Sequence, residues 1–139
     1  MIRIKKIDHI VIRTANPRDL IDFYCEVLGC NIEREVGEEF GLTQLRAGEC
    51  LIDIVDTEGD LGKMGGEAPT SKGNNMDHFC VQIQSIGEEE LKSFLKNKNI
   101  KVGEFANRYG AEGDGRALYI EDPDGNTIEL RPPKEKHNY

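Results

Sequence analysis

The sequence predicts an α+β protein made of two similar βαβββ modules that form a curved mixed sheet around a metal-binding cleft. A short motif, an apolar residue and Asp-His followed by apolar residues, occurs at residues 7–12 and again at residues 76–81, an offset of 69 residues from His9 to His78. An amphipathic helix pattern follows each copy, and three strand-like stretches follow each helix. A sheet covered by a helix on one face leaves its other face free, so two such sheets placed edge to edge would enclose a cleft.

The first module is predicted at residues 5–56. Its helix begins near Asn16, which can cap it, and Pro17 suits the first helical position. Gly29 ends the helix. The apolar face of this helix comprises Leu20, Phe23, Tyr24, Val27 and Leu28. The strands expected after it are residues 32–36, 42–46 and 50–56.

The second module is predicted at residues 76–132. Ser85 and Glu88 have the spacing of a capping box, and an apolar stripe of Leu91, Phe94 and Leu95 follows. The strands expected after this helix are near residues 102–105, 117–121 and 127–131. Residues 122–126 read as a turn by their composition, and residues 110–115 as a flexible hairpin loop. The two modules together would make a single domain.

A glycine-rich segment at residues 57–75 separates the two modules, with glycines at 59, 62, 65, 66 and 73. It is predicted to be a linker or a mobile lid. Residues 133–139 form a polar tail that is expected to fray.

Composition excludes several classes of function. The 139 residues carry 18 basic and 26 acidic side chains, a net charge of −8, which argues against nucleic-acid binding. No apolar run is long enough to cross a membrane, and the first residues lack a signal-peptide core, so a cytoplasmic protein is expected. The four cysteines form no CxxC pair and are expected to be reduced, buried apolar residues.

Strand alternation predicts which side chains face the cleft. His9 and His78 open equivalent strands, and Asp53 and Glu129 lie on the last strand of each module, all on the face away from the helices. Taken alone, each would ordinarily be a hydrogen-bonded core residue or a solvated strand end. Together, two imidazoles and two carboxylates are a ligand set for Zn, Ni, Co, Mn or Fe, and they do not select among these metals. Two positions of an octahedral ion would remain for water or substrate.

At this point the sequence resembles the vicinal oxygen chelate superfamily, also called the glyoxalase/bleomycin resistance/dioxygenase family. The resemblance covers roughly residues 5 to 132. It is carried by the segments Asp8-His9-Ile10-Val11-Ile12, Asp22 to Gly29 (DFYCEVLG), Asp77-His78-Phe79 and Tyr119 to Leu130 (YIEDPDGNTIEL). It implies the paired βαβββ fold, a metal in the cleft and often a dimer, here a homodimer. His9, His78 and Glu129 match the family's ligand positions. Asp53 departs from the Glu or Gln of the glyoxalase I and epimerase members. Three outcomes stay open for this shorter side chain: weak binding, binding through water, or an open position.

The resemblance implies a metal-dependent lyase or isomerase of the glyoxalase I kind, or an epimerase, acting on a small substrate with adjacent oxygens through an enediolate. Glu129 or Asp53 would be the general base. Arg116, Tyr119 and Arg13 are the candidate substrate-binding residues, since a small anionic substrate would need a cation and a hydrogen-bond donor. Two alternatives stay open: an Fe(II) ring-cleaving dioxygenase, and a non-catalytic small-molecule or drug-binding protein.

Overall fold

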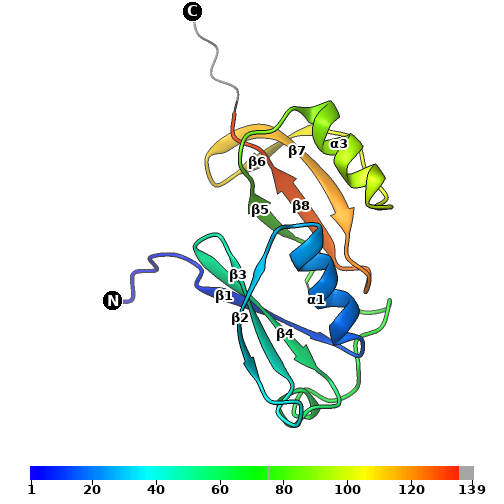
Figure 1. The fold of residues 1–139 in the computed structure, drawn as a ribbon. Helices are drawn as coiled ribbons and strands as arrows, with labels where there is room; N and C mark the ends of the chain where they lie inside the picture. Colours follow the sequence, from blue (N-terminus) through cyan, green and yellow to red (C-terminus); the bar gives the residue numbers. More distant parts are fainter. Residues whose placement is uncertain (75, 135–139) are drawn as a thin grey trace, which may run out of the picture. The chain divides into compact units, whose positions relative to one another are not determined.

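The computed structural model describes residues 1–74 and 76–134, and its contacts divide the chain into two compact units, Met1–Asn74 and Asn75–Tyr139 (Figure 1). The predicted tail lies outside the described residues from position 135 onward. None of the helices in the described ranges is long and apolar enough to span a bilayer.

The first unit contains one four-stranded mixed sheet. Its strands follow the order β1-β4-β3-β2, with β1 parallel to β4 and the other neighbours antiparallel. The elements along the chain are β1 (His9–Thr14), α1 (Pro17–Glu26), β2 (Asn31–Val36), β3 (Leu42–Ala47), β4 (Cys50–Asp56) and α2 (Asp60–Lys63). The βαβββ order predicted from the sequence is confirmed.

The second unit repeats the same topology, with strand order β5-β8-β7-β6 and β5 parallel to β8. Its elements are β5 (Phe79–Gln82), α3 (Glu88–Asn97), β6 (Ala106–Gly110), β7 (Gly113–Glu121) and β8 (Thr127–Arg131). The α+β class and the internal duplication are therefore both features of the structure.

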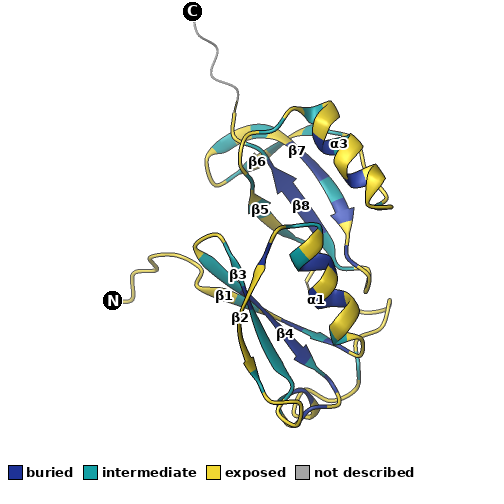
Figure 2. Ribbon diagram, in the orientation of Figure 1, coloured by how far each residue is buried: buried dark blue, intermediate teal, exposed yellow. Residues whose placement is uncertain are grey.

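Each unit has an apolar core on one face of its sheet (Figure 2). In the first unit, α1 packs against β3 and β4 and buries Leu20 and Tyr24 completely. In the second, α3 buries Leu91 and Leu95, while the predicted stripe member Phe94 stays 39% exposed. The strands contribute alternate residues to these cores, as Ile128 and Leu130 show on β8. The polar residues between them lie on the opposite face of the sheet.

The predicted helix caps are only partly correct. Pro17 occupies the first turn of α1, as expected, but the side chain of Asn16 makes no capping hydrogen bond; the Asn16 N–H instead donates to Thr14 Oγ1. Helix α3 begins at Glu88, with Gly87 at the N-cap position. Glu88 is therefore at the first helical position rather than the third, and the predicted capping box is wrong.

The strand expected near residues 102–105 is wrong as well. The strand lies at Ala106–Gly110, and it pairs with a β7 that already begins at Gly113. Residues 110–115 are thus mostly strand, joined by a tight turn at residues 111–112. The glycines looked like loop residues, but two of them serve close packing: a Cβ on Gly110 or Gly115 would come within 3.0 Å of the Arg131 guanidinium.

Much of the glycine-rich segment after β4 packs onto the first unit. The guanidinium of Arg13 donates to the carbonyl oxygens of Gly62, Gly66 and Glu67. The backbone N–H of Leu61 donates to the Phe40 carbonyl. Because these bonds hold its first ten residues or so to the body of the unit, this portion is ordered structure rather than a free linker.

Candidate functional site

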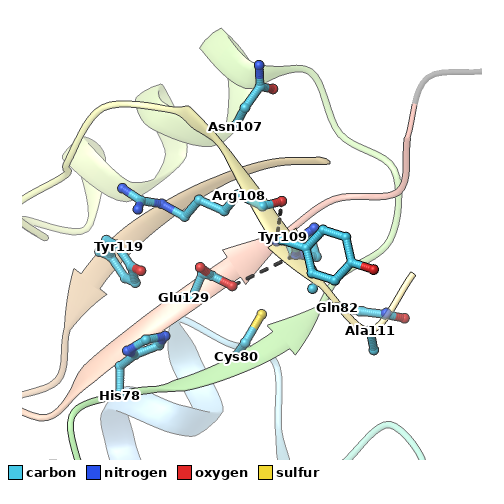
Figure 3. Close-up of a pocket in the computed structure, with 11 residues that line it drawn as sticks. His78, Cys80, Gln82, Asn107, Arg108, Tyr109, Ala111, Tyr119 and Glu129 are labelled. Atoms are coloured by element: carbon cyan, nitrogen blue, oxygen red, sulfur yellow. Dashed lines mark hydrogen bonds and ion pairs between the residues drawn. The ribbon is translucent and has the colours of Figure 1, made fainter. Parts of the chain in front are cut away.

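The second unit contains a cavity of about 550 Å³ on the sheet face opposite α3 (Figure 3). Side chains from β5, β7 and β8 form its floor, and the β6–β7 hairpin forms a wall. Its lining comprises His78, Cys80, Gln82, Asn107, Arg108, Tyr109, Gly110, Ala111, Tyr119, Glu129 and Arg131. Three residues singled out from the sequence, His78, Tyr119 and Glu129, therefore share one cavity.

Glu129 lies at the back of the cavity and is only 6% exposed. The register places it beside Cys80 on one neighbouring strand and Tyr119 on the other. Its Oε2 atom is 3.8 Å from Nε of Arg131, which is equally buried. A buried carboxylate needs such a countercharge, and the guanidinium of Arg131 provides one.

His78 is oriented by two neighbours. Its Nδ1 atom is 2.7 Å from a carboxylate oxygen of Asp77, and its ring meets the ring of Tyr119 edge to face at 5.1 Å. Because the carboxylate accepts a hydrogen bond from Nδ1, the neutral ring keeps its lone pair on Nε2, the atom free to bind a metal. An aspartate that fixes the second nitrogen is the usual support for a metal-binding histidine.

The first unit has a matching pair, His9 and Asp53, on the corresponding face of β1 and β4. His9 Nδ1 is 2.7 Å from Asp8, repeating the arrangement of His78 with Asp77. This hydrogen bond, and secondarily the charge of Asp53, raises the pKa of His9 above its usual value. Each unit thus supplies one imidazole and one carboxylate.

Asp53 also gives a test of whether these residues suit a cation. It is 3% exposed, and Gln44 Nε2 donates to its Oδ2 at 3.1 Å. Its Oδ1 atom is buried and has no hydrogen-bond partner within the described part of the chain. An unpaired buried carboxylate oxygen is costly, and a bound cation would remove that cost, so Asp53 by itself suits a cation ligand. Within residues 1–74 and 76–134, no three His, Cys, Asp or Glu side chains are grouped closely enough to hold an ion.

Two of the predicted substrate-binding arginines lie elsewhere. Arg116 is on the α3 side of β7, where it forms a two-atom contact with Glu88 that lowers the pKa of that carboxyl. The guanidinium of Arg13 donates hydrogen bonds to backbone carbonyls of the segment after β4. Neither lines the cavity. The strand predicted to begin at Ala117 begins at Gly113, so Arg116 lies inside it, on the opposite face from Tyr119.

Arg108 is one of several cavity residues from β6 that the sequence analysis did not single out. Its guanidinium lies 4.4 Å from the centre of the Tyr119 ring. Strand alternation places Arg108 and Gly110 on the same face of β6, and this pattern could have indicated Arg108 as a cavity residue. It was lost because the strand was expected four residues earlier, where Val102 and Phe105 are more apolar.

Cys80 provides a chemical probe of the cavity. Partial desolvation, and then its hydrogen-bonding interaction with Glu129, raises the pKa of its thiol to about 11. The neutral thiol is favoured below that pH, so in the metal-free protein at pH 8 we expect iodoacetamide to alkylate Cys80 about a hundredfold more slowly than in the urea-unfolded chain. Peptide mass spectrometry measures both rates. The folded rate should rise steeply towards pH 11, and equal rates at pH 8 would contradict this account.

Comparison with known proteins agrees with the duplicated fold. Residues 6–130 match the model of the Glyoxalase/Bleomycin resistance protein/Dioxygenase superfamily. The mitochondrial methylmalonyl-CoA epimerase of Dictyostelium discoideum is 24% identical over 115 residues, which are 81% of this chain and 68% of that protein.

Two solved structures share the fold. A virulence protein from Salmonella typhimurium is 25% identical with a TM-score of 0.71, covering 94% of this chain and 98% of that one. A lactoylglutathione lyase from Agrobacterium tumefaciens is 16% identical with a TM-score of 0.61, covering 91% and 92%, a likeness of fold alone. With the family model matching most of its length, the chain belongs to the Glyoxalase/Bleomycin resistance protein/Dioxygenase superfamily.

Proposed function

We propose that this protein is a metal-dependent lyase or isomerase of the glyoxalase kind, or an epimerase, that acts on a small substrate with two adjacent oxygens. The observation that carries the proposal is the cavity in which a buried carboxylate, Glu129, accompanies an imidazole, His78, whose Nδ1 is already bonded to Asp77. The epimerase from Dictyostelium supports proton transfer at carbon as the reaction class.

The proposed metal ligands are His9, Asp53, His78 and Glu129, two from each unit. The unpaired oxygen of Asp53 and the matching Asp-His pairs support this set. Zn, Ni, Co, Mn and Fe all accept such mixed nitrogen and oxygen donors. A bound divalent ion would supply Lewis-acid stabilisation of the negative charge that develops on the substrate oxygens.

The side chains around the cavity would carry the proton. A carboxylate, Glu129 or Asp53, accepts the proton from a substrate carbon next to a carbonyl group. After exchange with solvent, that carboxylate returns a proton to the adjacent carbon in an isomerase or lyase. In an epimerase, the other carboxylate delivers a proton to the opposite face of the same carbon. The hydroxyl of Tyr119 would donate a hydrogen bond to a substrate oxygen, and the guanidinium of Arg131, 3.8 Å from Glu129, would hold that carboxylate in place.

The test combines metal analysis with hydrogen exchange. Protein purified without added ions is analysed for metal content. It is then incubated in D₂O, with each of the five metals, with thiohemiacetals of 2-oxoaldehydes and with a methylmalonyl thioester. We expect one ion per chain and deuterium entering the substrate carbon, and His78→Ala should lose both. Oxygen uptake with catechols would point instead to a dioxygenase. Tight ligand binding without exchange under any metal would point to a binding protein.

The family also supports the proposal that the working form is a homodimer with a small molecule as its partner. Sedimentation or light scattering of the purified chain measures this directly, with a mass of twice 15.6 kDa expected.

A further inference from the structure

Three arginines of the second unit lie on the strands around the cavity, and two of them are already engaged. Arg131 donates to the carbonyl oxygens of Arg108 and Gly113 and lies beside Glu129. Its guanidinium fills a space that any side chain at Gly110 or Gly115 would occupy. Arg116 is paired with Glu88 on the opposite face of the sheet. Both terminal nitrogens of Arg131, and Nε with one terminal nitrogen of Arg116, are thus bonded within the protein.

Arg108 is in a different situation. It lines the cavity, and its guanidinium lies over the ring of Tyr119. Its Nε atom, like that of Arg131, is buried without a hydrogen-bond partner. Unlike Arg116 and Arg131, it forms no ion pair with a carboxylate of the described residues. The Tyr119 ring offers attraction to the cation but no acceptor for its N–H groups. The planar guanidinium therefore presents unused donors and an unbalanced charge to the cavity.

We infer that Arg108 forms an oxyanion subsite, which takes a carboxylate or phosphoryl group of the substrate. A guanidinium binds both groups with two parallel hydrogen bonds, and stacking on Tyr119 fixes the plane in which they form. Figure 3 shows Tyr119 between the end of Arg108 and the ring of His78, so the anionic group lies apart from the atoms that would reach His78 and Glu129.

This subsite defines the class of substrate for the proposed function. The assignment of that substrate class rests on the proposed function. The substrate would be a small acid, carrying one carboxylate or phosphoryl group in addition to its two adjacent oxygens. The charge of Glu129 does not oppose such a ligand strongly, because Arg131 Nε lies 3.8 Å from its Oε2 atom and balances that charge. The cavity volume, about 550 Å³, suits a molecule of that size.

The test uses the full chain without metal and measures binding alone. Malonate, inorganic phosphate and the uncharged malonamide are titrated against the ¹⁵N-labelled protein, following the amide resonances of β6 and β7. We expect malonate or phosphate to bind with a millimolar Kd, and malonamide not to bind. Arg108→Gln should weaken binding about ten- to a hundredfold. Arg108→Lys keeps the charge but loses the planar fork, so its affinity should lie between those of the original protein and Arg108→Gln. The relative affinities of malonate and phosphate identify which group the site prefers.

Lys92→Gln is the matched control, because it removes one positive charge from an ion pair with Glu104 on the surface of α3. Its Kd should stay within twofold of the original protein. Unchanged binding in Arg108→Gln, an equal loss in Lys92→Gln, or equal binding of malonamide would overturn the subsite. Since no metal or turnover is involved, the absence of hydrogen exchange would remove the proposed function while leaving this result standing, and the reverse also holds.

Discussion

Replacing Glu129 with glutamine is expected to lower kcat/KM for proton exchange by about 10²–10⁴-fold, the range typical for loss of a general acid or base. Glutamine has nearly the same shape but cannot accept the substrate proton, and it is a weaker metal ligand than a carboxylate. The effect should therefore fall on kcat and on metal affinity together. Deuterium incorporation at the substrate carbon measures the first, and metal titration measures the second.

Folding must be followed in the same variant, because Arg131 loses its countercharge. An unsatisfied buried group lowers the free energy of unfolding by about 1–3 kcal/mol. The kinetics are therefore measured at a temperature well below the unfolding transition of the variant. Glu104→Gln is the matched control, since Glu104 is an exposed acid paired with Lys92. If Glu129→Gln retained the activity of that control, Glu129 would be neither base nor essential ligand.

Gly62→Ala is expected to lower the free energy of unfolding of the first unit by about 3 kcal/mol or more, at the upper end of overpacking costs. A Cβ on Gly62 would overlap the carbonyl oxygen of Asp56 and come within 2.7 Å of the Thr57 Cα. Both are backbone atoms that cannot rotate away. The change would also push the carbonyl of Gly62 away from Arg13. Urea unfolding, monitored by circular dichroism, measures the loss.

Gly87→Ala is the control for the same chemical change. The nearest atom to a Cβ at this position is Glu90 Cβ at 3.9 Å, an ordinary contact, and its φ is −64°. Alanine there should alter stability by less than about 1 kcal/mol. Similar unfolding curves for the two variants would show that the segment after β4 is not packed as described.

The duplicated topology and the placement of His78 and Glu129 on the face away from the helix were predictable from sequence. Both depend on short-range patterns, a repeated motif and the two-residue alternation of a strand, which local residues specify. The limits of β6 were not predictable in the same way. The apolar residues before it resembled a strand, whereas the strand itself contains Asn107, Arg108 and Gly110 and is held by pairing with β7.

By itself, the sequence determined that there are two βαβββ units and that each carries one histidine and one carboxylate on its open face. Only the tertiary structure decided which arginine is available to a ligand. Arg116, Arg131 and Arg108 are alike as residue types, and their partners come from α3, from the hairpin backbone and from the Tyr119 ring. Those partners depend on the register between strands distant in the chain, and a local pattern does not contain that information.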